Sequence, residues 1–211
     1  MAVGDTITVA TGNGKDLTCV LNRITPDKVE ARVVGISGSQ GEPPCFIRLF
    51  QAIPKGDKTD LIVQKAVELG VSEIHLIRSE RCIVRESAAD KKKNDRYNRI
   101  AFEAAKQCGR GIVPKVMLPA GFSEAIASAA ESGLAFICHE TVSDRTLPGI
   151  FPEKPPSTIS FFVGPEGGFS EKEAEAAASL GIIPVGLGKR ILRAETAPMF
   201  VLSFISCRYE L

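Results

Sequence analysis

Two segments of the sequence combine glycines with charged side chains at points where a strand is expected to end. The first reads GPEGGFS over residues 164–170 and follows ISFFV over residues 159–163, which is expected to be a strand. Its three glycines allow left-handed backbone and close approach to a ligand, and the free N–H groups of a helix N-terminus follow directly. The segment has neither the Gly-Lys-Ser/Thr of a Walker loop nor the G-x-G-x-x-G spacing. It indicates a ligand-binding turn of another kind, with an ordinary strand-to-helix turn as the alternative.

The second segment reads VGLGKRILRAETAP over residues 185–198. It places three cations, one carboxylate and one hydroxyl between a glycine-flanked strand end and an apolar helix. Packing alone does not require Arg190, Arg193 and Glu195 together in a segment that leads into the core. These groups therefore indicate a functional site, with an Arg–Glu pair that caps the helix as the alternative.

Both segments must be positioned by the elements around them, and from residue 58 onward helical and strand patterns alternate. The clearest helix is expected where Ser170 and Glu173 form a capping box and Gly181 provides the end. Alternating strands and helices predict an α/β fold with a mostly parallel sheet, covered on both faces, that binds ligands at the carboxyl ends of its strands. We expect strands at residues 73–77, 116–118, 134–138, 158–163 and 183–187, and helices at 58–69, 92–107, 123–131, 170–180 and 196–209.

The first 50 residues have a different pattern. Short runs rich in Val, Ile and Thr alternate with turn clusters such as residues 11–14, which predicts a small all-β module. Residues 52–57 have the composition of a linker, so we expect one domain over residues 1–53 and a second over residues 54–211. The strands of the first domain are expected at residues 5–10, 16–24, 29–36 and 45–52.

The composition is that of an ordinary globular protein. Of the 211 residues, 44% are hydrophobic and 24% are charged, which excludes a disordered, collagen-like or coiled-coil chain. No apolar run approaches the roughly 18 residues of a membrane span, and the N-terminus lacks signal-peptide features, so we expect a cytoplasmic protein without a membrane partner. The six cysteines are scattered singly, which indicates neither a disulfide framework nor a zinc site, and no metal is expected.

The net charge of +1 conceals an uneven distribution. Residues 75–115 contain eleven Lys or Arg and five Asp or Glu, a balance of +6, whereas residues 120–185 contain three and nine, a balance of −6. A basic region of this kind can attract a polyanion to one face of the protein. The alternative is a solvated helix face formed by Lys91, Lys92, Lys93, Arg96 and Arg99.

Residues 164–170 and 187–197 together resemble the two signature motifs of the 16S rRNA (uracil(1498)-N3)-methyltransferase family of the SPOUT superfamily. The resemblance continues at residues 55–58, 64–65, 68–71, 79–81 and 103–110, and so covers nearly the whole chain. It implies a small N-terminal PUA-like β-barrel and a SPOUT-type methyltransferase domain with a deep trefoil knot. Family members usually carry a further strand ahead of a Gly-Asp pair, which this chain has at residues 4–5, so we expect the barrel to be incomplete at its N-terminus.

The resemblance also implies an activity, the S-adenosylmethionine-dependent methylation of N3 of a uridine in 16S rRNA of the small ribosomal subunit. Because N3 is a weak acid, a cation that stabilises the developing anion would promote the reaction, and Arg193 is the leading candidate. Glu166 or Glu195 would orient that arginine or accept the proton. The residues implied to hold S-adenosylmethionine are His139, Glu140, Gly164, Glu166, Gly168, Leu187, Gly188, Ile191, Leu192 and Thr196.

The implied partners are 16S rRNA and a second copy of the chain. The helix expected at 196–209 is apolar on most sides, so it packs into the core or forms a homodimer through Met199, Phe200 and Phe204. The candidate RNA-binding residues are Arg78, Ser79, Arg81, Arg99, Gln107 and Arg110.

Two other functions stay open. A SPOUT ribose 2′-O-methyltransferase usually carries Ser-Leu-Asn in its second motif, where this chain has ILRAET over residues 191–196. A non-catalytic rRNA-binding or ribosome-assembly protein would not need the intact glycine segments.

Overall fold

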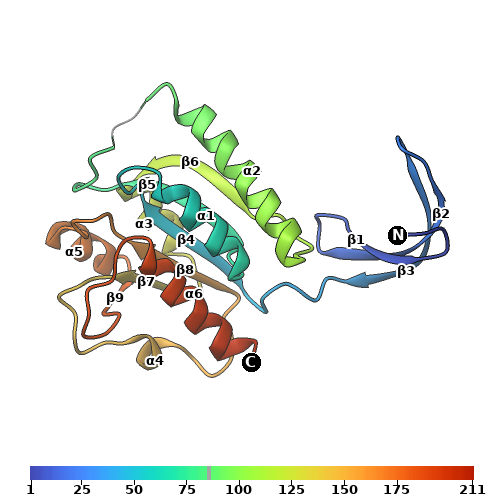
Figure 1. The fold of residues 1–211 in the computed structure, drawn as a ribbon. Coiled ribbons are helices and arrows are strands. Elements are labelled where there is room, and N and C mark those ends of the chain that lie inside the picture. The colour runs from blue at the N-terminus through green and yellow to red at the C-terminus, as the bar shows by residue number, and fades with distance from the viewer. Residues whose placement is uncertain (85–86) are drawn as a thin grey trace. The chain divides into compact units, whose positions relative to one another are not determined.

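A computed structural model describes residues 1–84 and 87–211 of the chain (Figure 1). The chain divides into two compact units. The smaller unit comprises Met1–Glu42 and Ala105–Val113, and the larger unit comprises Pro43–Ala104 and Pro114–Leu211. All the residues expected to hold the cofactor therefore lie in the larger unit.

The smaller unit contains a three-stranded antiparallel sheet in the order β1-β2-β3. Its strands are β1 (Thr6–Ala10), β2 (Lys15–Ile24) and β3 (Val29–Gly38), close to the positions expected from the sequence. The turn between β1 and β2 contains Gly12 and Gly14, both with positive φ, a conformation that glycine adopts without a steric penalty.

The larger unit is built on a six-stranded parallel sheet in the order β6-β5-β4-β8-β7-β9. Every strand of this sheet that the alternating pattern predicted is present. The strands are β4 (Phe46–Ala52), β5 (Glu73–Arg78), β6 (Lys115–Gly121), β7 (Leu134–Cys138), β8 (Thr158–Val163) and β9 (Ile183–Val185).

Strand β4 corrects the expected domain boundary. We assigned residues 45–52 to the N-terminal β module, but β4 lies in the middle of the parallel sheet, between β5 and β8. Ile47, Leu49 and Phe50 are all almost completely buried, which is typical of a parallel strand covered on both faces. The first unit boundary therefore falls between residues 42 and 43 rather than between 53 and 54, and residues 105–113, which we assigned to the second domain, belong to the smaller unit.

Helices cover both faces of this sheet. Helices α1 (Lys58–Glu68) and α6 (Thr196–Tyr209) lie side by side on one face (Figure 1). Apolar side chains of α3 (Phe122–Ala129) and α5 (Glu171–Ser179) pack with strand residues in one core cluster on the other face. Helix α2 (Asp90–Cys108) follows β5. The single turn α4 (Leu147–Ile150) is too short to give a periodic pattern and was not expected.

A row of aromatic rings joins the central strands on the α3 face. The ring of Phe50 in β4 stacks on Phe162 of β8 with 4.5 Å between centroids, and on His75 of β5 with 4.6 Å. Phe122 of α3 contacts Phe162 edge-on, at 6.1 Å. This packing fixes β8, which leads into the first glycine segment, against the neighbouring strands.

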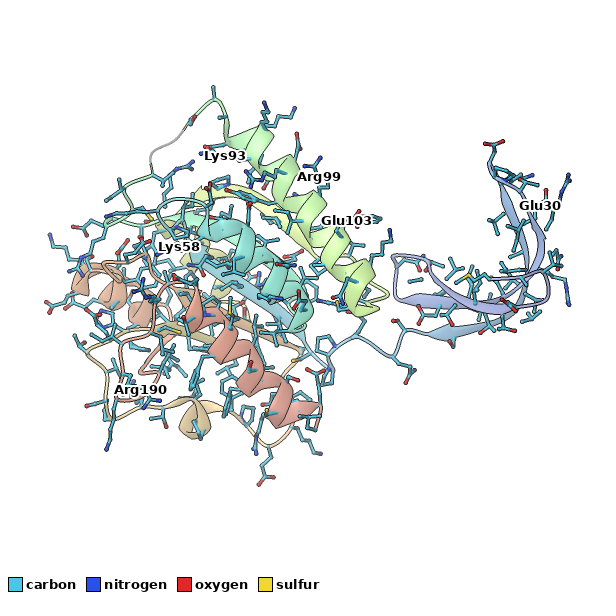
Figure 2. The ribbon with its side chains drawn as sticks, viewed as in Figure 1. Glu30, Lys58, Lys93, Arg99, Glu103 and Arg190 are labelled. Carbon is cyan, nitrogen blue, oxygen red and sulfur yellow. The ribbon has the colours of Figure 1, made fainter. Side chains whose placement is uncertain are left out.

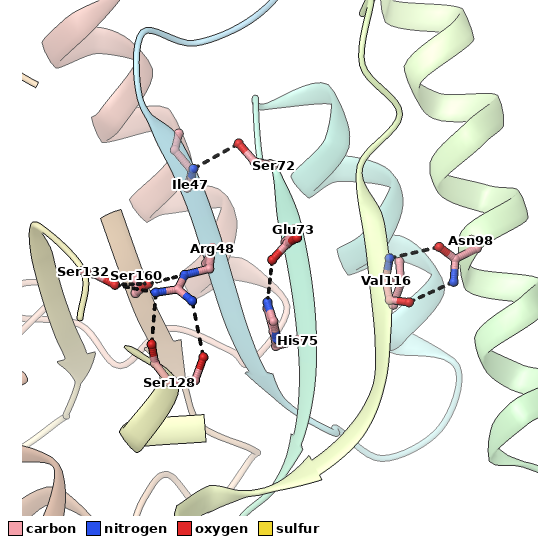
Figure 3. A network of polar contacts seen from close by, with 10 residues as sticks. All are labelled: Ile47, Arg48, Ser72, Glu73, His75, Asn98, Val116, Ser128, Ser132 and Ser160. Atoms are coloured by element: carbon pink, nitrogen blue, oxygen red, sulfur yellow. Dashed lines mark hydrogen bonds and ion pairs between the residues drawn. The ribbon is translucent and has the colours of Figure 1, made fainter. Parts of the chain in front are cut away.

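Polar contacts complete the same face (Figure 3). The guanidinium of Arg48 donates to Ser160 Oγ at 2.9 Å, Ser132 Oγ at 2.7 Å and the carbonyl oxygen of Ser128 at 3.2 Å. Since these partners come from β8 and from α3 and the residues after it, a single side chain ties three segments together. Arg48 is half-buried, and it needs such partners because an unpaired charge away from water is strongly unfavourable.

Candidate functional site

A cavity of about 360 Å³ lies at the carboxyl ends of β7, β8 and β9. This is the edge at which open parallel sheets bind ligands, and the volume lies within the ~300–1,000 Å³ of small-molecule sites. Both segments singled out in the sequence border it. Its lining comprises Lys58, Cys138, His139, Glu140, residues 163–166, Gly168, Phe169, residues 187–194 and Ala197.

Glycines shape the cavity in two ways. A Cβ on Gly164 would lie 3.0 Å from the backbone of Gly168, so the first segment can close on itself only with glycine there. Gly168 and Gly188 have φ of +66° and +108°, values that side-chain-bearing residues rarely adopt. A Cβ on Gly188 would meet no described atom within 4 Å, so this residue borders open space.

The second segment is held against the loop after β7 by a close backbone crossing. A Cβ on Gly186 would lie 1.9 Å from the carbonyl oxygen of Val142, which leaves no room for any side chain. The N–H of Gly186 donates to the carbonyl oxygen of Arg145 at 2.9 Å, and Gly186 forms a parallel bridge with Thr146. The residues after β9 thereby pass against the loop after β7, which contains His139.

Lys58, the first residue of α1, links the motifs electrostatically. Its Nζ lies 2.9 Å from Oε1 of Glu166 in the first motif and 3.3 Å from Oε2 of Glu195 in the second. The hydrogen bond with Glu166 raises the pKa of Lys58 above its ordinary value, although desolvation opposes the shift. A cation at a helix N-terminus is disfavoured by the helix dipole, and the two carboxylates offset that effect. A lysine at the first residue of the helix expected at 58–69 was the sequence signal for this pairing, but Lys58 was not among the residues expected to act at the site.

Glu166 is held as an ionised group. Desolvation would raise the pKa of Glu166, but the hydrogen bonds from Lys58 Nζ and from the backbone N–H of Lys55, at 3.2 Å, outweigh it and lower the pKa. A carboxylate with a lowered pKa is a weak base. The pairing therefore argues against Glu166 as the proton acceptor. We expected Glu166 or Glu195 to orient Arg193 or to accept the proton, and the ion pairs of both carboxylates are with Lys58.

Arg193 lines the cavity from the segment that precedes α6. Its carbonyl oxygen accepts hydrogen bonds from the N–H groups of Thr196, at 2.9 Å, and Ala197, at 3.0 Å, and the next residue, Ala194, is buried. The backbone is thus anchored at the helix while the Arg193 side chain is exposed at the cavity. Arg190 is exposed in the same loop (Figure 2).

The lining fits a nucleoside-like cofactor with an apolar ring and polar substituents. Phe169 and Leu187 contribute apolar walls. Nδ1 of His139 pairs with Thr141 Oγ1 at 2.9 Å, whereas Nε2 is buried and has no hydrogen-bond partner among the described residues. Burial raises the pKa of Cys138 to about 12, so this thiol is neutral and not a nucleophile. In the described part of the chain, no three His, Cys, Asp or Glu side chains are grouped to hold a metal ion.

The structure gathers nine of the ten residues expected to hold the cofactor around this cavity. Thr196 is the exception, since it is exposed as the first residue of α6 and is not part of the lining. The nine lining residues are His139, Glu140, Gly164, Glu166, Gly168, Leu187, Gly188, Ile191 and Leu192.

Two residues expected to contact RNA are buried. The Arg110 side chain is only 3% exposed and its Nη2 lies 2.6 Å from Oε2 of Glu42, within the smaller unit. Ser79 is 7% exposed, and its Oγ lies 3.3 Å from Sγ of Cys82. Buried groups with internal partners cannot reach a phosphate without unfolding locally, so the structure corrects these two assignments.

Two further candidates have internal partners although they are less buried. Arg78 forms an ion pair with Asp90 at the start of α2. Nη1 of Arg81 donates to the carbonyl oxygen of Gly167 at 2.7 Å. By contrast, Arg99 and Gln107 are exposed on α2, and Arg99 projects from this helix (Figure 2).

Comparison with known proteins gives a consistent result. Residues 41–206 match the family described as the RNA methyltransferase domain. A Bacillus subtilis protein named ribosomal RNA small subunit methyltransferase E is 33% identical over 217 residues, which cover 100% of this chain and 85% of that protein. A protein of the same name from Mesomycoplasma hyopneumoniae is 33% identical over 183 residues, or 87% of this chain and 79% of that protein.

Solved structures agree with these matches. A ribosomal RNA small subunit methyltransferase E from Neisseria gonorrhoeae, bound to S-adenosyl methionine, superposes with a TM-score of 0.86 at 35% identity, covering 99% of this chain and 85% of that one. A Legionella pneumophila methyltransferase in complex with the cofactor SAM has a TM-score of 0.83 at 33% identity, with coverages of 98% and 84%.

Proposed function

The chain belongs to the RNA methyltransferase family, and we propose that it transfers the methyl group of S-adenosylmethionine to N3 of one uridine in the 16S rRNA of the small ribosomal subunit. The observation that carries the proposal is the cavity at which both glycine segments and Arg193 meet. The relatives named ribosomal RNA small subunit methyltransferase E support the substrate, and the cofactor-bound neighbours support S-adenosylmethionine.

Three kinds of groups would hold the cofactor. Gly164, Gly168 and Gly188 present backbone at the cavity without side chains in the way, and Phe169 and Leu187 provide an apolar slot. When bound, S-adenosylmethionine supplies a methyl group on a positively charged sulfur. The residues that line the cavity would hold this group in place, so that the acceptor atom would meet a preorganised site.

Arg193 assists the acceptor. Before it can accept a methyl group, N3 must lose its proton to solvent, and the resulting negative charge spreads onto the uracil carbonyl oxygens. The bond from N3 to the methyl carbon would then form as the methyl–sulfur bond breaks, with that electron pair left on the sulfur. The Arg193 guanidinium stays protonated at physiological pH and offers a planar set of donors to such an oxygen. Glu166 and Glu195 do not move the proton. Each forms an ion pair with Lys58, and these pairs hold the two motifs together.

Mass spectrometry of nucleosides tests the reaction. Small-subunit rRNA incubated with the protein and S-adenosylmethionine should yield 3-methyluridine, and the modified site should stop reverse transcriptase because N3 lies on the Watson–Crick edge. A product that is only 2′-O-methylated would instead favour the ribose methyltransferase. Binding of rRNA with no methylated nucleoside would favour the non-catalytic RNA-binding protein.

The exposed cations of α2 are proposed to contact RNA phosphates. Lys93 and Arg99 project from this helix (Figure 2). Each phosphate contact to a single strand contributes about 0.7 to the slope of log affinity against log salt concentration. Replacing both residues with alanine should therefore reduce the slope by about 1.4, as measured by filter binding at several salt concentrations.

Lys172→Ala provides the matched control, because it removes one exposed cation from α5 and should leave the slope unchanged. An unchanged slope for the α2 variant would indicate that these residues only solvate the helix. Arg85, which belongs to the basic region in the sequence, lies outside the described residues.

A homodimer through α6 is proposed as the assembly. Phe200 is 45% exposed on this helix, whereas Phe204 packs on Phe151 at 5.0 Å between ring centroids, inside the unit. Apolar side chains left on a helix face are typical of obligate interfaces. Sedimentation at micromolar concentration should give the dimer mass for the parent protein and the monomer mass for Phe200→Asp. A monomeric parent protein would contradict the proposal.

Within residues 1–84 and 87–211, every helix is too short or too polar to cross a membrane. We propose the cytoplasm as the location, since that is where a small-subunit rRNA would be modified. The antiparallel sheet of the smaller unit is proposed as the PUA-like module that binds RNA, and the trefoil knot of the larger unit stays a prediction.

A further inference from the structure

A tight turn follows β5 and is anchored in the core of the larger unit. The N–H of Cys82 donates to the carbonyl oxygen of Ser79 at 3.0 Å, which closes the turn. The Cys82 side chain packs against the apolar cluster beneath α3 and α5, and its Sγ lies 3.5 Å from the carbonyl oxygen of Ile53. Residues 79–82 are therefore a fixed part of the fold.

This turn is joined to the N-terminus of α5 by a closed set of hydrogen bonds. The N–H of Glu80 donates to Oε1 of Glu173 at 2.8 Å, and the hydroxyl of Ser170 donates to Oε2 of Glu80 at 2.7 Å. Ser170 and Glu173 are also the two members of the capping box of α5, and both are buried. The capping box thus serves a second purpose, since it fastens the turn after β5 beside the first glycine segment.

Arg81 extends from this anchored turn to the glycine segment itself. Its Nη1 donates to the carbonyl oxygen of Gly167 at 2.7 Å. Its aliphatic stem covers the same residue, because a Cβ on Gly167 would lie 3.5 Å from Cδ of Arg81. The N–H of Gly168 in turn donates to the carbonyl oxygen of Pro165 at 2.9 Å, so the arginine caps a closed turn.

The turn that Arg81 holds is a wall of the cavity. Gly164, Pro165, Glu166 and Gly168 line the cavity, whereas Arg81 does not. Any movement of the Gly167 carbonyl would move its neighbours on both sides, and with them the backbone offered to a ligand. Arg81 is exposed, and its Nη1 already donates to this carbonyl, so an RNA phosphate that took up this donor would compete with an existing hydrogen bond.

We propose that Arg81 is a positioning residue for the cofactor site, which holds the turn of residues 165–168 in its binding geometry, and not a ligand of RNA phosphates. The inference rests on the proposed function, because it takes S-adenosylmethionine as the occupant of the cavity. A hydrogen bond from a charged group typically contributes enough free energy to change an equilibrium by about 10-fold. Loss of the guanidinium should therefore weaken cofactor binding by about 10-fold.

Two variants isolate the guanidinium. Arg81→Met keeps a stem over Gly167 and removes the donor, so the protein should fold and its thermal midpoint should stay close to that of the parent. Arg81→Lys restores a charged donor of similar reach. Calorimetry with S-adenosylmethionine, without RNA, should show about 10-fold weaker binding for Arg81→Met and substantial recovery for Arg81→Lys.

Kinetics distinguish positioning from general damage. For Arg81→Met, the KM for S-adenosylmethionine should rise while kcat at saturating cofactor stays within about 2-fold of the parent value. The reason is that a site saturated with cofactor no longer depends on the hydrogen bond from Arg81 to the Gly167 carbonyl oxygen. The salt slope of RNA binding should be the same for the parent and both variants. Arg99→Ala is the matched control, and it should lower the salt slope and leave cofactor affinity unchanged.

The outcomes separate the two levels of inference. If the parent protein fails to bind S-adenosylmethionine, the proposed function is wrong. If the parent binds it and Arg81→Met binds equally well, Arg81 has no positioning role. A decrease in the salt slope of about 0.7 for Arg81→Met alone, with cofactor affinity unchanged, would assign Arg81 to the RNA surface and overturn the inference.

Discussion

Replacing Arg193 with lysine is expected to slow single-turnover methylation by about 10²- to 10³-fold while S-adenosylmethionine binds with unchanged affinity. The rate falls because the reaction depends on a donor already aimed at the place where negative charge develops. A lysine keeps the charge but loses the planar fork of donors, and its mobile stem must be ordered in each turnover. The cofactor affinity holds because the glycine backbone of both motifs is untouched.

Arg190→Lys is the matched control for this experiment. Arg190 is exposed in the same loop and also lines the cavity, but the reaction is assigned to Arg193. Rapid-quench measurement of methyl transfer to rRNA, with calorimetry of cofactor binding alongside, gives both quantities for each variant. A full rate for Arg193→Lys would remove Arg193 from the reaction but leave the assignment of the cofactor cavity standing.

Replacing Gly188 with valine is expected to weaken cofactor binding by on the order of 100-fold. The φ of +108° at Gly188 strains any residue with a side chain, typically by ~1–3 kcal/mol, and a β-branched residue most of all. The added side chain would also occupy open space beside the cavity, where no described atom lies within 4 Å of its Cβ. Both effects act on the same loop, so calorimetry with S-adenosylmethionine should detect the loss directly.

Gly181→Val separates backbone strain from loss of the site. Gly181 has a φ of +82°, and a Cβ there would also meet no described atom within 4 Å, but it follows α5 outside the cavity lining. The two variants should lose similar stability in thermal unfolding, while Gly181→Val retains cofactor affinity. Equal affinity for Gly188→Val and the parent protein would place the cofactor elsewhere.

The expected α/β class, the capping box and the family resemblance are confirmed. Ser170 Oγ accepts from the N–H of Glu173 at 3.3 Å and the N–H of Ser170 donates to Oε2 of Glu173 at 2.9 Å. The match over residues 41–206 and the full-length relatives agree with the resemblance read from the two motifs. These features were accessible because capping, helical periodicity and glycine spacing are local properties of the chain.

Strand β4 shows where local patterns fail. Residues 45–52 follow three strands of an antiparallel sheet in the sequence, and nothing within the segment says which sheet it joins. Its pairing partners β5 and β8 begin at residues 73 and 158, so its place depends on contacts far along the chain. Residues 45–52 are apolar except for Arg48 and Gln51, which fits a strand buried on both faces, but proximity in sequence outweighed that signal in our domain assignment.

The partners of the charged residues were likewise decided only by the tertiary structure. The sequence by itself determined that two glycine motifs, a cationic loop and a basic helix exist, since each is a local pattern of residue types. It did not determine that Lys58 pairs with Glu166 and Glu195, or that Arg110 is buried against Glu42. The physical reason is that a side chain's charge belongs to the residue, whereas its burial and its partner belong to the packing of segments that are distant in sequence.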